Sequence, residues 1–236
     1  MVFNHKIKVV VKTLRSLFWS VMFNVRYLPL RQAYKLPILV YKPCFLALKG
    51  KVIIDAPIKT GMIRLGWDSC SLYYPNNRYG IIFENHGGTI IFKGSAIVGS
   101  GSAISVGPKG IIEFGNDFVA TANAKFISFN HIVFGKYCRV AWEVIVMDTD
   151  LHQTINKETG KKSTINAEII IGRNNWIGNK CLILKRTVTP DYCIIAAYSI
   201  VDKKIEYEPY CLCGGNPIEL KRVGVYRDLD SHEDLC

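Results

Sequence analysis

Residues 148–178 read DTDLHQTINKETGKKSTINAEIIIGRNNWIG. Near its end this stretch contains an Ile-x-Ile-Gly motif at residues 169–172. The same pattern, with Phe in the third place, occurs at residues 112–115 and 132–135. A looser copy starts at Ile90, and the starts at 90, 112, 132 and 169 are separated by 22, 20 and 37 residues. Repeats of this period predict a solenoid, in which each unit buries its apolar face against the next one.

The longest step between two repeats is one repeat plus an insertion. Residues 153–168 are polar and contain Gly160, which is typical of a solvent-facing loop. Within the repeats, Ile, Val and Phe alternate with small residues, and no long apolar run with a period of 3.6 residues occurs. This alternation favours short strands over helices, so the repeats predict a parallel β-helix with an extended loop at 153–168.

Three ordered segments resemble a known family. They are WEVIVMDTDLH at 142–152, IGRNNWIG at 171–178 and GNP at 215–217. Together they resemble the left-handed β-helix acyltransferases built on hexapeptide repeats, of the maltose, galactoside and xenobiotic acetyltransferase type. The similarity extends over residues 90–222 and is greatest to the enzymes that O-acetylate capsular or other surface polysaccharides.

The resemblance implies an all-β fold, a left-handed parallel β-helix of hexapeptide repeats. We expect an N-terminal amphipathic helix before it and a short C-terminal segment after it. It also implies that acetyl-CoA donates an acetyl group to a sugar hydroxyl of a surface glycan, in a homotrimer whose active sites lie between subunits. N-acetylation of an amino sugar and a non-catalytic, membrane-docked scaffold are the alternatives.

His152 is the candidate general base. The imidazole titrates near neutral pH, and Asp148 and Asp150 are close enough in sequence to orient the ring and stabilise its protonated form. An ordinary loop histidine is the alternative, but the resemblance implies a catalytic base at this position. The chain contains no Gly-x-Ser-x-Gly nucleophile motif, which favours direct transfer in a ternary complex over an acyl-enzyme.

The resemblance also assigns candidate residues for the two substrates. Asn123 and Trp142 are the candidates for acceptor binding, although an Asn at a turn and a Trp in a coil can equally be structural. The candidates for acetyl-CoA binding are Trp176, Gly178, Ala196, Ala197, Lys203, Lys221 and Arg222. Residues 196–201 read AAYSIV where relatives have a Gly at the position of Tyr198, so this side chain either narrows the thioester channel or points away from it.

The charge of the chain is concentrated at its N-terminal end. The net charge is +11, and residues 1–51 contain ten Lys and Arg but no Asp or Glu. We divide the chain into this basic segment, an acyltransferase domain at 52–205 and a C-terminal segment at 206–236.

Residues 6–26 predict a helix with an apolar stripe from Ile7 to Val25, too often interrupted by charge to span a membrane. The stripe and the cations favour an anionic membrane, at the inner face of the cytoplasmic membrane, over nucleic acid. Packing of the stripe on the β-helix or on another subunit is the alternative.

The eight cysteines indicate no metal site. They form no CxxC pair and have no zinc-like spacing with His, so we interpret them as reduced, mostly buried thiols of a cytoplasmic protein. Cys211 and Cys213 would share one face of a strand, but the sequence offers no further ligand beside them.

Overall fold

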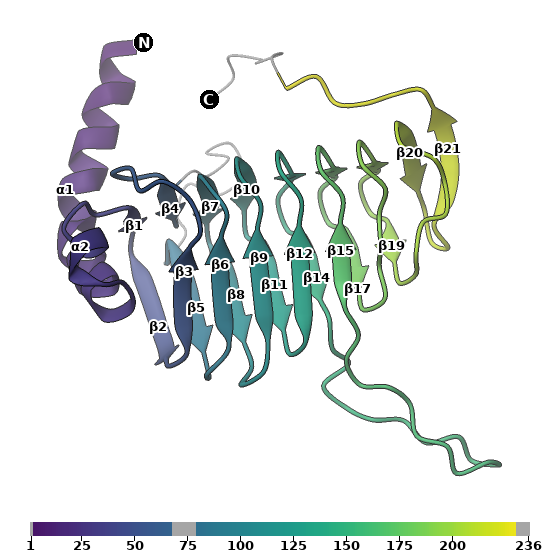
Figure 1. Ribbon diagram of the computed structural model, residues 1–236. Helices are drawn as coiled ribbons and strands as arrows, with labels where there is room; N and C mark the ends of the chain where they lie inside the picture. The colour runs from purple at the N-terminus through teal and green to yellow at the C-terminus, as the bar shows by residue number, and fades with distance from the viewer. Residues whose placement is uncertain (1, 68–78, 230–236) are drawn as a thin grey trace.

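The chain coils repeatedly through three faces. Each of the first five coils has one short strand on every face, and the coils after β15 (Ile169–Ile171) have strands on two faces only. The computed structural model describes residues 2–67 and 79–229, with the side chains of the first helix described from residue 12. Strands of successive coils pair in parallel and form three sheets around one interior (Figure 1). The fold is the expected left-handed parallel β-helix.

We call the three faces sheets A, B and C, and give their strands in the order in which they pair. Sheet A contains β1 (Ile38–Val40), β4 (Ile63–Leu65), β7 (Ala96–Ser100), β10 (Phe118–Ala122), β13 (Arg139–Val140), β16 (Trp176–Ile177), β18 (Ile194–Ile195), β20 (Cys211–Gly214) and β21 (Glu219–Val223). Sheet B contains β2 (Pro43–Leu48), β5 (Ile81–Asn85), β8 (Ser102–Val106), β11 (Lys125–Ser128), β14 (Ile145–Met147), β17 (Leu182–Leu184) and β19 (Ile200–Val201). Sheet C contains β3 (Lys51–Ile54), β6 (Thr89–Phe92), β9 (Ile111–Phe114), β12 (His131–Phe134) and β15 (Ile169–Ile171).

The sequence repeats lie in register in sheet C. Ile90 pairs with Ile112, Ile112 with Ile132, and Ile132 with Ile169. The predicted equivalence of the four repeat starts is therefore confirmed residue by residue. The same register extends one coil further toward the N-terminus, where Val52 pairs with Ile90.

The glycine of the motif is required by the closeness of the coils. A Cβ atom on Gly115 would lie 2.3 Å from the carbonyl oxygen of Gly135, and one on Gly135 would lie 2.5 Å from the backbone nitrogen of Arg173. No side chain fits at these separations, so the backbones of successive coils can meet there only if the residue is glycine.

Aromatic side chains fill the interior between the sheets. Phe92 stacks on Phe114 with ring centroids 5.2 Å apart, and Phe114 stacks on Phe134 at 5.7 Å. Phe118 and Phe126 pack against this column at an angle from the other two sheets. All five rings are buried, which accounts for much of the apolar area removed from water in the central coils.

Two helices cover the N-terminal end of the β-helix: α1 (Val2–Tyr27) and α2 (Leu30–Ala33) (Figure 1). Polar side chains of α1 face the edge strand β1. The hydroxyl of Ser20 accepts a hydrogen bond from the Val40 amide (2.9 Å), while Asn24 exchanges two hydrogen bonds with the backbone of Ile38 (2.6 and 3.2 Å). An edge strand has unpaired backbone groups, and α1 satisfies them here.

The domain boundaries differ from those expected. The strands β1 and β2 precede residue 52, and they pair with β4 and β5, so the β-helix begins at Ile38 rather than at residue 52. It also continues past residue 205, because β20 pairs in parallel with β18. Only then does β21 turn back antiparallel to β20 and end the stack.

The expected loop at 153–168 is a long hairpin that leaves the β-helix between β14 and β15 (Figure 1). Antiparallel bridges join Thr149 to Asn166 and Ile155 to Lys162. The hairpin is exposed along most of its length, so it extends into solvent from the single chain.

Candidate functional site

The corner between sheets A and B, which we call the A–B corner, is a column of left-handed residues. Gly101, Asn123, Glu143, Lys180 and Tyr198 all have a positive φ, between 50° and 78°. Each of the last four donates its backbone N–H to the preceding coil, at 3.0–3.1 Å. Asparagine tolerates this conformation well, so Asn123 has a structural reason to be there.

Asn123 also lines a shallow pocket of about 400 Å³ on the sheet B side of this corner. The pocket is also lined by Lys125 and Glu143, so it combines polar groups with the apolar surface of Ile145. Glu143 lies 3.6 Å from Lys180 of the next coil. An acceptor hydroxyl would find both hydrogen-bond donors and acceptors here, and the predicted acceptor role of Asn123 stays a prediction.

A larger groove, of about 690 Å³, follows the outer face of sheet A beside the same corner. Its lining is mostly apolar and comes from five strands together with the chain after β21. The lining residues are Val119, Thr121, Arg139, Val140, Ala141, Trp142, Trp176, Gly178, Asn179, Ile194, Ile195, Ala196, Ala197, Leu212 and Arg227. The structure thus brings together five predicted binding residues: Trp142, Trp176, Gly178, Ala196 and Ala197.

Two arginines give the groove a positive end. Arg227 lies over the ring of Trp176, 5.3 Å from its centroid, and forms no ion pair with any residue that the structure describes. Burial, and then the charge of Arg139, lower the pKa of Arg227. Asp117 pairs with Arg139 at 2.7 Å and so neutralises that arginine. Among the described residues, no carboxylate forms an ion pair with Arg227, so its charge stays unbalanced. An anionic ligand would be stabilised at this end of the groove.

The groove also offers an unused polar atom. The hydroxyl oxygen of Thr121 is buried and has no hydrogen-bond partner within the described residues. Buried polar groups are normally hydrogen-bonded, and a bound molecule would supply such a partner. An elongated, largely apolar ligand with an anionic group therefore suits the groove.

Small residues keep the groove open where two coils touch. A Cβ atom on Gly178 would lie 2.6 Å from the Ala197 nitrogen, so glycine is needed there for coil packing alone. Tyr198 lies at the corner with 65% of its surface exposed, and the Lys180 ammonium lies 5.1 Å from its ring centroid. Of the two orientations considered for Tyr198, the single chain has the one that points outward.

The three predicted phosphate-binding cations lie outside the groove lining. Lys221 and Arg222 are exposed on β21, where Lys221 pairs with Glu219 at 2.9 Å. Lys203 is exposed at the other edge of sheet B, beside a separate pocket that includes Ile218. Sequence reasoning missed Arg227, which reaches the groove because the chain after β21 runs back across the coils (Figure 1).

The corner between sheets B and C, the B–C corner, holds the base of the hairpin. Asp148 is buried there, and its carboxylate accepts hydrogen bonds from the amides of Phe129 and Asn130 and from the Ser128 hydroxyl, at 2.7, 2.9 and 2.7 Å. These three bonds fix the turn of the preceding coil. The carboxylate of Asp148 therefore serves the turn, in place of the expected contact with His152.

Asp150 closes the neck of the hairpin. Its carboxylate pairs with Lys185, and the Lys185 ammonium also donates to the carbonyl of Thr164 on the returning strand. The Asp150 amide donates to the Ile165 carbonyl at 3.0 Å. Two residues further on, His152 is exposed and has no partner among the described residues. The contacts of Asp148 and Asp150 thus hold the backbone just before His152, and the imidazole itself stays exposed to solvent.

One chain does not bring the groove and His152 together. Trp142 precedes β14 at the A–B corner, whereas His152 follows β14 beyond the B–C corner. The strand of three residues between the corners spans about 10 Å at roughly 3.3 Å per residue, and further backbone separates each residue from it. The groove and the candidate base therefore lie at opposite edges of sheet B.

A second histidine lies in a row of charges on the outside of sheet C. The His131 ring is 3.0 Å from Glu113 and 2.9 Å from Glu168, and Glu113 pairs with Lys93 at 2.8 Å. Burial raises the pKa of Glu113, but hydrogen bonds from Lys93 and His131 outweigh this and hold it below its usual value. Both ring nitrogens are engaged, as expected for a structural histidine.

Three buried thiols meet inside the last coils. The sulfur atoms of Cys193, Cys211 and Cys213 lie within 4.8 Å of one another, so Cys193 provides the neighbour that the sequence did not reveal beside Cys211 and Cys213. A hydrogen bond from Cys193 lowers the pKa of Cys213 to about 7, against the effect of burial. Three sulfurs could bind a soft metal ion, although a tetrahedral zinc site needs a fourth ligand.

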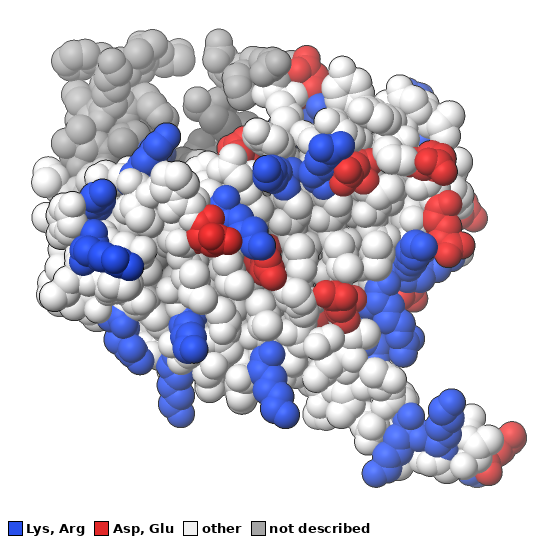
Figure 2. All heavy atoms as spheres, viewed as in Figure 1, with Lys and Arg blue, Asp and Glu red and all other residues white. Residues whose placement is uncertain are grey.

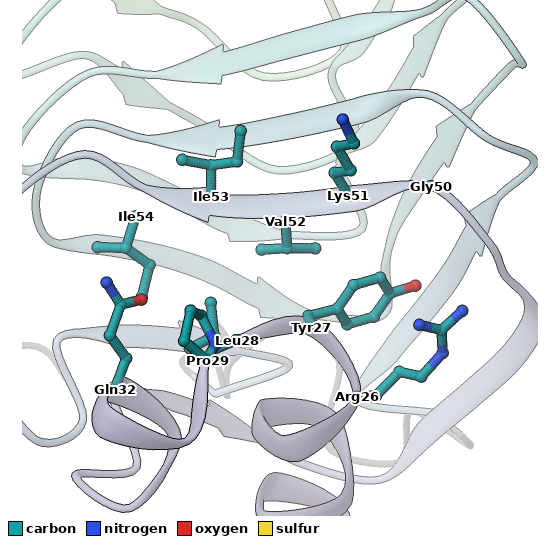
Figure 3. Close-up of a pocket in the computed structure, with 10 residues that line it drawn as sticks. All are labelled: Arg26, Tyr27, Leu28, Pro29, Gln32, Gly50, Lys51, Val52, Ile53 and Ile54. Carbon is teal, nitrogen blue, oxygen red and sulfur yellow. The ribbon is translucent and has the colours of Figure 1, made fainter.

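A further groove, of about 410 Å³, separates the end of α1 from β3 (Figure 3). Arg26, Tyr27 and Gln32 line one side, while Lys51 and apolar residues of β3 line the other. It contains no His, Asp, Glu, Ser or Cys that could act as base or nucleophile. This groove is therefore not a candidate for acyl-transfer chemistry.

Comparison with known proteins supports the fold. No family model matches the chain, and no curated protein matches its sequence. The crystal structure of the polySia-specific acetyltransferase NeuO is similar with a TM-score of 0.56 and 13% identity, over 82% of this chain and 92% of that chain. These values establish the fold, which this chain shares with hexapeptide-repeat acetyltransferases.

Two other solved structures match more distantly. The polysialic acid O-acetyltransferase OatWY has a TM-score of 0.45 and 15% identity, over 84% of this chain and 92% of its own. Galactoside acetyltransferase in complex with coenzyme A has a TM-score of 0.39 and 22% identity, over 60% of this chain and 64% of its own.

Proposed function

We propose that this protein is an acetyltransferase that moves the acetyl group of acetyl-CoA to a hydroxyl group of a surface or capsular glycan. The observation that carries the proposal is the apolar groove with an unbalanced arginine at one end, since the acetyl-CoA molecule has the same two parts. Its pantetheine arm suits the apolar wall from Trp176 to Ala197, and its phosphates suit Arg227.

His152 acts as the general base in this proposal. The acceptor hydroxyl gives its proton to the imidazole as its oxygen attacks the thioester carbonyl carbon. The tetrahedral intermediate then collapses, the carbon–sulfur bond breaks, and the leaving thiolate of coenzyme A takes the proton from the imidazolium. The products are an acetyl ester and free coenzyme A, with no covalent enzyme intermediate.

The working enzyme is a homotrimer in which the active site lies between two subunits. The separation of the two edges of sheet B supports a site shared between chains, because the groove and His152 of the same chain lie at opposite edges of that sheet. A neighbouring subunit whose B–C corner faces the groove would complete the site. Asn123 and Trp142 at the A–B corner would then lie near the acceptor.

The acceptor that we propose to test first is an acidic surface glycan. NeuO is a polySia-specific acetyltransferase and shares the fold, which makes acidic surface glycans the first acceptors to test. The pocket beside Asn123 also contains Lys125 and Glu143, so it offers hydrogen-bond donors and acceptors to the hydroxyl groups of a sugar and one cation to an acidic group.

The donor can be tested before the acceptor is known. We expect acetyl-CoA to bind to the purified full chain in calorimetry and to be displaced by coenzyme A. With polysialic acid or an isolated capsular glycan, thiol release should depend on the acceptor, and mass spectrometry should find one acetyl group added per modified sugar. An amino sugar in a parallel reaction distinguishes ester from amide formation, and a protein that does not bind acetyl-CoA contradicts the proposal.

A further inference from the structure

The α1 helix presents its polar side to the protein and its apolar side to solvent. Ser16, Ser20 and Asn24 are fully buried, together with Phe23. On the opposite side, the side chains of Leu14, Phe18 and Val25 are 66%, 71% and 56% exposed. This arrangement is the reverse of the usual surface helix, whose apolar stripe faces the core.

The burial of the polar side has a local cause. The edge strand β1 needs hydrogen-bond partners for its backbone, and Ser20 and Asn24 supply them. The Ser20 hydroxyl also donates to the Ser16 carbonyl at 2.8 Å, so these side chains are fully engaged within the interface. Once this side of α1 faces β1, the apolar stripe has no place on the β-helix.

The exposed stripe is continuous along the helix. Leu14, Leu17, Phe18, Val21 and Val25 recur at intervals of three and four residues, which places them on one face. Trp19 lies beside the stripe, with its ring in edge contact with Phe18 at 5.0 Å. A row of this kind needs a cover that is not part of the single described chain.

The surrounding charge indicates what the cover is. Arg15 is exposed on one flank of the stripe. Arg26, about three helical turns further on, lies on the same flank, with its guanidinium donating to the Leu48 carbonyl at 2.7 Å. The sequence has no acid before Asp55, and the coloured atoms at this end of the molecule in Figure 2 include Lys and Arg but no Asp or Glu. A second copy placed on the stripe would bring another set of cations against the first.

We propose that the exposed face of α1 lies on an anionic membrane surface, with the stripe in the interfacial layer and the flanking cations at the lipid phosphates. Within the described residues, no helix is both long enough and apolar enough to cross a bilayer, so the attachment is peripheral. Interfacial helices of this kind combine an apolar face with basic flanks, and aromatic residues such as Trp19 suit the headgroup layer. The surface expected from the sequence is the inner face of the cytoplasmic membrane.

Vesicle sedimentation of the full chain tests the proposal. At low salt, the protein should sediment with vesicles of phosphatidylcholine and phosphatidylserine but not with phosphatidylcholine alone. The double variant Phe18→Ser, Val25→Ser should bind at least about tenfold more weakly, since both side chains reach solvent and neither supports the fold. The matched control is Ile155→Ser, Val223→Ser, which removes two exposed apolar side chains elsewhere and should bind like the unchanged protein.

A charge variant separates the two contributions. Arg15→Gln should weaken binding and reduce its salt dependence, whereas Lys157→Gln in the hairpin should leave both unchanged. Equal binding by the stripe variant and its control overturns the proposal. The unchanged protein could also fail to bind anionic vesicles while the stripe variant changes the oligomeric mass in light scattering. That result would overturn the proposal and assign the stripe to a contact with a second copy. These outcomes do not depend on acetyl transfer.

Discussion

The A–B corner and the B–C corner border the same sheet but are built in different ways. At the A–B corner, left-handed residues repeat coil after coil beside a long apolar groove. At the B–C corner, a hairpin interrupts the repeat once. Buried Asp148 and paired Asp150 hold its base, and the exposed ring of His152 follows them. The regular corner thus suits the binding of an extended ligand, and the broken corner holds a single side chain that can move a proton.

This difference also suggests why a site would need two chains. A β-helix is quasi-one-dimensional, and residues at opposite edges of one sheet stay apart in every coil. Bringing the two corners together therefore requires a neighbouring copy rather than a change within the chain. Substitutions at the B–C corner should therefore change turnover, and substitutions in the groove at the A–B corner should change the Michaelis constant for acetyl-CoA.

The largest expected effect is at the B–C corner. We expect His152→Ala to lower turnover by about 100-fold or more, which is the usual contribution of general acid–base catalysis, with little change in acetyl-CoA affinity. Steady-state kinetics and a thermal melt measure both properties. His86→Ala is the control, because His86 lies at the B–C corner of an earlier coil, before the hairpin, and its ring pairs with Glu84. Near-normal activity of His152→Ala would exclude the assignment.

The groove should respond through the Michaelis constant instead. Arg227→Gln is expected to raise the KM for acetyl-CoA about tenfold, the loss of one charge-assisted contact, with a smaller change in turnover. The double variant Lys221→Ala, Arg222→Ala should raise the same constant less, since both side chains are exposed and Lys221 already pairs with Glu219. If the double variant has the larger effect, the phosphates lie on β21 rather than at Arg227.

Substitutions at the neck of the hairpin should lower turnover less than His152→Ala does and should leave the Michaelis constant unchanged. We expect Asp150→Asn to lower turnover severalfold and leave the KM for acetyl-CoA unchanged, because Asp150 positions the base of the loop through Lys185. The matched variant Lys185→Met should behave in the same way, and combining the two should add little. Additive effects, or a change in KM, would contradict a shared positioning role.

The smallest effect concerns the charge row on the outside of sheet C, which takes no part in the proposed chemistry. The pKa of Glu113 is lowered in the folded protein, so its ionised form stabilises the fold above the ordinary carboxylate pKa, and this contribution is lost as the pH falls through the lowered value. Glu113→Gln should cost less than about 1 kcal/mol at neutral pH, since Lys93 is half exposed, and less again at pH 3. Denaturant melts at the two pH values measure it, and an equal cost at both would contradict the ionic origin.

The sequence predicts the central coils because each one repeats the same requirement. Ile112 and Ile132 begin the repeated motif and pair in register, and glycine is the only residue type that fits between the backbones at 115 and 135. The first and last coils lack this motif. The strands β1 and β2 lie among prolines, and β20 contains two cysteines in place of the branched residues, so the pattern alone does not reveal them.

The residues of the groove can be predicted from the sequence only where they belong to the repeat. Trp176 and Ala196 belong to the repeat and are found from motifs, whereas Arg227 follows the last strand and reaches the groove only because the chain turns back. The periodicity of α1 likewise predicts an apolar stripe but not the direction it faces. That direction depends on the hydrogen bonds between Asn24 and β1, which have no counterpart in the sequence pattern.

The central claim, that each active site combines two chains, can be tested by mixing two inactive variants. His152→Ala removes the base, and Ala197→Trp places a large side chain in the groove proposed to hold acetyl-CoA. The two variants are purified, unfolded and refolded together, and assayed beside each variant refolded alone. We predict that the mixture regains a clear fraction of the unmodified activity, because some interfaces then join an intact groove to an intact His152. A mixture as inactive as its components, with mixed oligomers shown to be present by mass spectrometry, would contradict a site shared between chains.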